Sequence, residues 1–175
     1  LPAEFPPPRI RFAGSEPPAP GEPPFKGLQF FDEKDAQIFF GRELLTSKLV
    51  NRIRGTQPLL AVIGASGSGK SSLVRAGFIP ALRNGHPMID GMKPLKDDLD
   101  WEIHLITPSA HPLEALAAEL TRNSETVTAA ATLMDDLAKD PRSLSLFLAR
   151  KNGKNNTLLV VDQFEELFTL CRDEF

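Results

Sequence analysis

The sequence predicts an α/β fold with a mainly parallel sheet, and three observations lead to this prediction. Short apolar runs alternate with stretches of helical spacing, the order expected when helices connect parallel strands. One apolar run leads directly into a glycine-rich loop that a helical stretch follows. Hydrophobic residues form 41% of the 175 residues, which is enough to build a core.

Hydrophobic spacing and breaker residues define the expected elements. Leu45, Leu49 and Ile53 recur four apart, which indicates one face of a helix that Gly55 ends. Pro80 is expected to kink or end its own helix. In chain order we expect a helix at 42–54, a strand at 58–63, a helix at 70–84, a loop at 84–100, a strand at 101–107, a helix beginning at Pro112, helices at about 128–139 and 141–151, a turn at 153–156, a strand at 157–161 and a helix at 163–171.

The first 24 residues differ in composition from the rest of the chain. They contain nine of the 16 prolines. Because proline fixes φ and lacks a backbone donor, we expect a disordered linker at 1–24 and a folded part at 25–175. A proline-rich ligand for a partner domain is the alternative. Since the sequence begins with Leu1 rather than Met, we expect an excised piece with an upstream partner.

The loop after the first apolar run has the spacing G-x-x-x-x-G-K-[ST]. Glycines allow its backbone N–H groups to approach phosphate oxygens, and the following helix N-terminus favours an anion. Lys70 would reach the β- and γ-phosphates, and the hydroxyl of Ser71 would bind Mg²⁺. The alternative is a flexible turn with a solvated lysine. The residues of the motif are Gly64, Ala65, Ser66, Gly67, Ser68, Gly69, Lys70 and Ser71.

An acidic residue ends the last apolar run. Asp162 follows four apolar residues, and ligands gather at the carboxyl ends of parallel strands. We therefore expect Asp162 to join Ser71 in holding Mg²⁺, although a helix cap is the alternative. Glu165 and Glu166 lie three and four residues further, on the same face if the chain is helical there. Either could act on an attacking water, or both could simply favour the helix dipole.

Several stretches resemble the STAND class of P-loop NTPases, and more narrowly the bacterial novel STAND NTPases that often precede WD-type or other repeats. The resemblance covers about residues 24–175. It rests on PFKGLQFF at 24–31, FFGRE at 39–43, the phosphate loop with SLVRAG at 72–77, and VVDQFEELF at 160–168.

The resemblance implies an ATP-operated signalling switch. It implies binding of ATP or ADP with Mg²⁺, slow hydrolysis helped by Lys70 and a glutamate, and a homo-oligomer of the full-length protein. An effector would lie upstream and a repeat or sensor region downstream. Ser72 would join the phosphate loop, and Phe40, Gly41 and Arg42 would lie near the adenine and ribose, although packed aromatics at a helix start are the alternative.

The resemblance also implies an AAA-like three-layer module that is truncated after its third core strand. Related folds with a catalytic glutamate place a fourth strand between the first and third, then a fifth strand and a helical lid. The sequence ends at Phe175, so we expect a piece incomplete for catalysis, with unpaired edges on the strands at 58–63 and 157–161. Direct pairing of those two strands would contradict this topology.

Composition excludes several other classes. A net charge of −3 and a pI near 5.7 argue against a nucleic-acid-binding surface, which needs clustered positive charge. No apolar run reaches the roughly 18 residues of a membrane-spanning helix. A single cysteine fits a reducing compartment, so we expect a cytoplasmic protein.

Two alternatives to a switch stay open. One is a nucleotide-binding scaffold without turnover. The other is a transporter or DNA-loading P-loop ATPase, although the sequence has neither an L-S-G-G-Q signature nor a basic stripe. Among other residues, we expect Arg75 and Arg83 to lie at the surface, although contact with a phosphate from a neighbouring subunit is the alternative. We expect His104 to be solvated or structural.

Overall fold

The computed structural model describes residues 26–27, 29–54, 59–84, 101–124, 126, 128–151 and 156–172. The linker expected at 1–24 lies outside these residues, as do Gly55 and nearly all of the expected loop at 84–100 and turn at 153–156. In chain order the elements are η1 (Glu33–Ile38), α1 (Glu43–Arg54), α2 (Lys70–Ser72), η2 (Leu73–Phe78), α3 (Ile79–Asn84), β1 (Trp101–Ile106), α4 (Pro112–Thr121), α5 (Ala129–Lys139), α6 (Ser143–Lys151), β2 (Asn156–Val161) and α7 (Glu166–Thr169).

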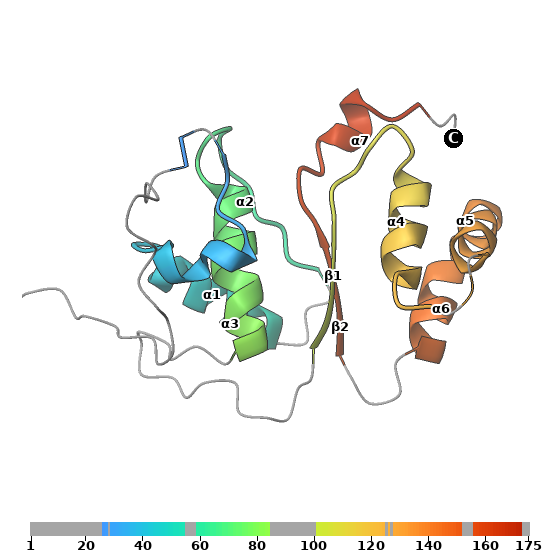
Figure 1. The fold of residues 1–175 in the computed structure, drawn as a ribbon, viewed down its shortest axis with the longest axis horizontal. Coiled ribbons are helices and arrows are strands. Elements are labelled where there is room, and N and C mark those ends of the chain that lie inside the picture. Colours follow the sequence, from blue (N-terminus) through green and yellow to red (C-terminus); the bar gives the residue numbers. More distant parts are fainter. Residues whose placement is uncertain are drawn as a thin grey trace, which may run out of the picture.

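The described strands are parallel and lie between two groups of helices (Figure 1). The helices α1 to α3 cover one face of the β1–β2 pair, and α4 to α6 cover the other. In the register of the two strands, Ile103 faces Leu158 and Leu105 faces Val160. The expected α/β class with parallel strands is therefore confirmed.

Each layer has its own apolar cluster. On the side of α1 to α3, Ile103 packs with buried residues of the helices, of which Val50 and Ile79 are fully buried. On the side of α4 to α6, Ala117 and Leu120 pack against Leu133. The apolar strand residues Ile103, Leu105, Leu158 and Val160 all belong to the first cluster, whereas the second consists of helix residues.

The helix expected at 70–84 is confirmed, with an irregular middle. The segments α2, η2 and α3 follow each other without a break, and η2 is a wider π-helical turn in which Ile79 N–H bonds to the carbonyl oxygen of Val74. Pro80 does not end the helix, which continues to Asn84. The wide turn directly precedes Pro80, which itself has no N–H to donate.

The strand expected at 58–63 is not formed in the described part, residues 59–63. Leu59 is 80% and Ile63 92% exposed, although both were expected in a buried strand. A strand requires a neighbouring backbone, and within the described residues the sheet consists of β1 and β2, with which this run does not pair. The run and β2 are thus not directly paired, so the result that would have contradicted the expected topology is not observed.

Other expected elements shift by small amounts. In α1, Val50 is fully buried, whereas Leu45 is 39% exposed. The buried face of this helix is therefore rotated from the predicted face of Leu45, Leu49 and Ile53. The last helix is shorter than expected and spans only Glu166–Thr169. Pro112 does occupy the first turn of α4, as predicted.

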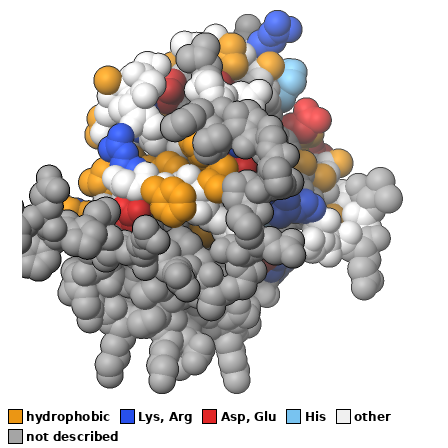
Figure 2. All heavy atoms as spheres, turned by 60° about the vertical axis from the view of Figure 1, so that its left-hand side comes forward, with side chains coloured by type: hydrophobic (Ala, Val, Ile, Leu, Met, Phe, Trp, Pro, Cys, Tyr) orange, Lys and Arg blue, Asp and Glu red, His pale blue; other side chains and the backbone are white. Residues whose placement is uncertain are grey.

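No described helix is long and apolar enough to cross a bilayer. Hydrophobic side chains nevertheless reach the surface on the face that Figure 2 shows. The large exposed ones in residues 26–54 are Phe30, Phe40, Leu44 and Leu45.

Candidate functional site

The glycine-rich loop at 64–69 turns the chain into the helix at 70–84. Gly67 and Gly69 have φ values of +74° and +83°, in the left-handed region. A Cβ at either position would meet no atom within 4 Å, so backbone conformation rather than space requires glycine there. Gly69 is the N-cap, and the first N–H groups of the helix therefore face the loop without intrahelical partners.

Lys70 folds back over this loop. Its Nζ donates hydrogen bonds to the carbonyl oxygens of Gly64, at 2.9 Å, and Ala65, at 3.1 Å. The N–H of Ser68 closes a turn on the carbonyl oxygen of Ala65 at 3.2 Å. The residues of the phosphate-loop motif thus form one compact loop with an ammonium group beside it.

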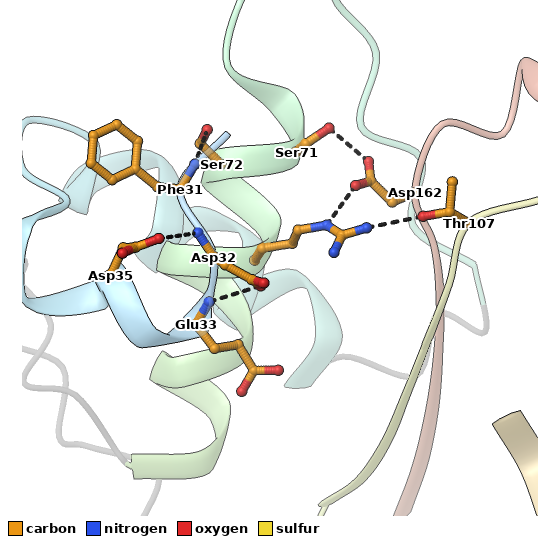
Figure 3. A network of polar contacts seen from close by, with 9 residues as sticks. Phe31, Asp32, Glu33, Asp35, Ser71, Ser72, Thr107 and Asp162 are labelled. Atoms are coloured by element: carbon orange, nitrogen blue, oxygen red, sulfur yellow. Dashed lines mark hydrogen bonds and ion pairs between the residues drawn. The ribbon is translucent and has the colours of Figure 1, made fainter. Parts of the chain in front are cut away.

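Ser71 and Asp162 are in direct contact (Figure 3). The Oγ of Ser71 donates to Oδ1 of Asp162 at 2.9 Å, across 91 residues of sequence. Asp162 directly follows β2, and its N–H continues the ladder by bonding to the carbonyl oxygen of Ile106 at 2.9 Å. With Asp162 only 9% exposed, the first turn of the helix and the end of the strand meet at a buried carboxylate.

Arg75 also binds this carboxylate, which the sequence did not suggest. Its Nε donates to Oδ2 of Asp162 at 2.8 Å, and the two side chains are 14% and 8% exposed. Its Nη2 donates to Oγ1 of Thr107 at 2.9 Å, just beyond β1. The expectation of a surface residue is therefore wrong for Arg75. The available signal was its spacing of four from Ser71, which places both on one helix face.

The segment before α1 is anchored on the same helix. The N–H of Phe31 donates to Oγ of Ser72 at 3.0 Å (Figure 3), so the hydroxyl of Ser72 is engaged with this segment. Arg83 forms a partly exposed ion pair with Glu33, 2.7 Å between Nη1 and Oε2. The segment therefore contacts the helix at 70–84 near both ends of that helix.

A buried carboxylate organises η1, an element that the sequence did not predict. Asp32 caps η1 through a hydrogen bond from Glu33 N–H at 2.9 Å, and Asp35 accepts one from Asp32 N–H at 2.8 Å. Asp35 also pairs with Lys26. Burial raises the pKa of Asp35, but the hydrogen bonds from Lys26 and Asp32 and the charges of Lys26 and Lys34 together outweigh burial and lower that pKa.

A cleft of about 410 Å³ lies between α1, the run at 59–63 and the loop. Of the three residues expected near the base and ribose, Arg42 lines this cleft. Gly41 precedes it with a φ of +82°, and Phe40 is 63% exposed. The lining residues are Arg42, Leu45, Lys48, Leu49, Ala61, Val62, Ile63, Gly64, Ser68, Gly69, Lys70 and Leu73.

In comparison with known families, residues 24–175 match the family described as Novel STAND NTPase 1. The chain belongs to the Novel STAND NTPase 1 family. No curated protein and no solved structure matches it significantly. Membership in this family supports a P-loop NTPase that binds nucleotide together with a divalent metal.

Two oxygen-bearing side chains of this STAND NTPase chain are suitable ligands for a divalent cation. The carboxylate of Asp162 and the hydroxyl of Ser71 supply the oxygen ligands that Mg²⁺ prefers. No group of three or more His, Cys, Asp or Glu that could hold a metal occurs within the described ranges. A cation held here would therefore need further oxygen ligands from phosphates and water.

The two glutamates of the STAND NTPase chain lie beyond an unusual turn. Gln163 has a φ of +58°, in the left-handed region, so residues 162–165 form a turn and the helix begins only at Glu166. Glu165 becomes the N-cap of α7 and Glu166 its first residue. The shared helical face expected for Asp162 and these glutamates therefore does not form, and the described polar contacts of the Asp162 side chain are with Ser71 and Arg75.

Proposed function

We propose that the chain binds Mg²⁺–ATP at residues 64–71 together with Asp162. The observation that supports this most is the 2.9 Å hydrogen bond from Ser71 to Asp162, because it joins the end of the loop motif to the acidic strand end. A phosphate chain beside the loop would meet backbone N–H groups, the Lys70 ammonium and a metal-binding carboxylate within one small region.

The cleft beside the loop is the proposed position of the base and ribose. Its volume of about 410 Å³ lies within the usual range for small-molecule pockets. Leu45, Leu49 and Val62 provide an apolar lining, and Arg42 and Lys48 add positive charge at the lining. We propose Arg42 as a direct nucleotide contact, and Phe40 and Gly41 as residues that position it.

In this proposal each polar residue has a separate task. Lys70 leaves the carbonyl oxygens of Gly64 and Ala65 and neutralises the β- and γ-phosphates. Ser71 and Asp162 hold Mg²⁺, which supplies charge neutralisation of the phosphates when bound. The backbone of Ser72 continues the helix N-terminus, while its hydroxyl stays with Phe31.

We propose slow ATP hydrolysis, in which Glu165 or Glu166 orients the attacking water. A scaffold without turnover is the second candidate, because the left-handed turn at Gln163 keeps both glutamates out of the described contacts of Asp162. The substitutions Glu165→Gln and Glu166→Gln separate the two. If the protein turns over, one of them traps ATP and stops phosphate release, whereas a scaffold binds ATP unchanged in both.

At the level of the full-length protein, we propose a signalling switch. Family membership favours this over a transporter or DNA-loading ATPase. In the switch, nucleotide state controls homo-oligomer assembly between an upstream effector and a downstream repeat or sensor region. The single cysteine fits a cytoplasmic location, which is also proposed.

The experiment that tests nucleotide binding is a titration of the full chain with fluorescent ATP. Lys70→Ala should weaken binding at least about a hundredfold, because the phosphates lose their charge partner. Lys139→Ala, at an exposed position on α5, is the matched control and should bind like the unchanged chain. Equal affinity in the Lys70 and Lys139 variants would overturn the proposal.

A further inference from the structure

Arg75 occupies the side of Asp162 that Ser71 leaves free. Ser71 binds Oδ1 of the carboxylate and Arg75 binds Oδ2, each within 2.9 Å. Both partners come from the helix after the phosphate loop, whereas Asp162 ends β2. A buried carboxylate needs a compensating positive charge, and Arg75 supplies it inside the fold.

The same guanidinium touches two further parts of the chain. Nη2 donates to Thr107 at 2.9 Å, next to the end of β1, and Cζ lies 4.5 Å from the ring centroid of Phe30. A planar guanidinium can stack on an aromatic ring and donate in its own plane at the same time. Arg75 therefore joins both strand ends to the segment that precedes α1.

A divalent cation would compete with this arrangement. It would need a carboxylate oxygen of Asp162, and the fixed positive charge of Arg75 lies 2.8 Å from Oδ2. Two cations sharing one buried carboxylate repel each other strongly in a medium of low dielectric constant. Metal binding and the Arg75 ion pair thus oppose each other.

We propose that Arg75 is the internal counter-ion of Asp162 and that a divalent cation must displace Arg75 to bind there. This displacement would break the contacts of Arg75 with Thr107 and Phe30. The proposal rests on the proposed metal site at Asp162. It makes Arg75 a positioning residue that couples loading of the site to the segment at 29–32. The N–H of Phe31 reports on this coupling, because it bonds to Ser72 on the same helix.

The test is Mn²⁺ binding to the full chain without nucleotide, measured by electron paramagnetic resonance. Mn²⁺ takes the same oxygen ligands as Mg²⁺. Arg75→Gln should bind Mn²⁺ about tenfold more tightly than the unchanged chain, because a repelling charge is gone. The double variant with Asp162→Asn should lose this gain. A merely structural role would predict weaker binding, so equal or lower affinity in Arg75→Gln would overturn the proposal.

A second variant covers the case in which Arg75→Gln does not fold. Thr107→Val keeps the Arg75 charge but removes one anchor, and should raise Mn²⁺ affinity about twofold to threefold. Unchanged affinity would contradict the proposal. In the unchanged chain, saturating Mn²⁺ should also speed hydrogen exchange at Phe31, and no change there would remove the coupling to the segment.

ATP affinity of the unchanged chain, measured with Mg²⁺ and then with EDTA, separates this proposal from the proposed function. Absence of ATP binding under both conditions would reject the nucleotide site itself. If ATP binds normally but neither Arg75→Gln nor Thr107→Val binds Mn²⁺ more tightly, only the proposed role of Arg75 is rejected.

Discussion

Arg75 and Asp162 form a buried ion pair, 2.8 Å from Nε to Oδ2, although 87 residues separate them in the sequence. The pair fixes the helix after the phosphate loop against the end of β2. Together with the hydrogen bond from Ser71, it gives both carboxylate oxygens a partner from one helix. The geometry of the candidate site therefore depends on contacts that also hold the layers of the fold together.

Asp162→Asn should lower the free energy of unfolding by about 2 kcal/mol, because Arg75 keeps its charge in a buried place without the matching anion. Urea denaturation measures this difference. Asp135→Asn, at an exposed position on α5, is the matched control and should change stability by less than about 0.5 kcal/mol. Equal stabilities of the two variants would show that the ion pair does not stabilise the fold.

The pair of Lys26 and Asp35 should make stability depend on pH. Because the folded-state pKa of Asp35 is lowered, its contribution is present above the ordinary carboxyl pKa of 3.8 and is lost as pH falls through the lower, folded value. Lys26→Met should therefore destabilise the chain by about 1–2 kcal/mol at pH 7 and progressively less below about pH 4. Thermal unfolding across this range measures the effect, and a pH-independent loss would contradict the assignment.

Gly77 lies where α1 packs closely on the helix after the loop. A Cβ there would come within 2.6 Å of Oγ1 of Thr46 and 3.3 Å of the Phe39 ring. Gly77→Ala should therefore cost about 1–2 kcal/mol of stability despite the better helix propensity of alanine. Adding Thr46→Ala should recover most of the loss, because the nearest atom is removed. An additive loss in the double variant would show that this contact is not the cause.

Gln163 adopts the left-handed backbone conformation, with a φ of +58°, although it is not a glycine. Gln163→Gly should stabilise the chain by about 0.5–1 kcal/mol, since glycine adopts this conformation without steric cost. Gln163→Ala is the control and should give no gain. Thermal unfolding of both variants checks this, and a loss in the glycine variant would mean that the side chain itself stabilises the turn.

Local pattern was enough to predict most elements of this fold. Hydrophobic spacing and apolar runs predict the two strands and the helices at 43–54, 70–84, 112–121, 129–139 and 143–151, and Pro112 marks the start of one helix. For the candidate site, the sequence proposed the glycine-rich loop and Asp162 because each matches a motif, and their roles remain proposals. The rule that ligands gather at the carboxyl ends of parallel strands predicted that Asp162 lies near this loop, and the structure adds the direct hydrogen bond from Ser71.

Long-range contacts explain what the sequence could not predict. The run at 59–63 has the composition of a strand, but hydrogen bonds to a neighbouring backbone decide whether one forms. Arg75 has an ordinary helical position, and only the fold brings Thr107 and Asp162 to it. Glutamine rarely adopts a positive φ, so the sequence gives no sign of the turn at Gln163. The prediction that Asp162 and the two glutamates share a helical face was therefore wrong.

We propose above all that the phosphate loop and Asp162 form one Mg²⁺–ATP site. Calorimetric titration of the full chain with ATP, with Mg²⁺ and then with EDTA, tests it most directly. We expect one ATP per chain, about tenfold tighter binding with Mg²⁺, and no such gain in Asp162→Asn, because the metal then lacks its carboxylate. Absence of ATP binding under both conditions, or an equal Mg²⁺ gain in Asp162→Asn, would contradict the claim.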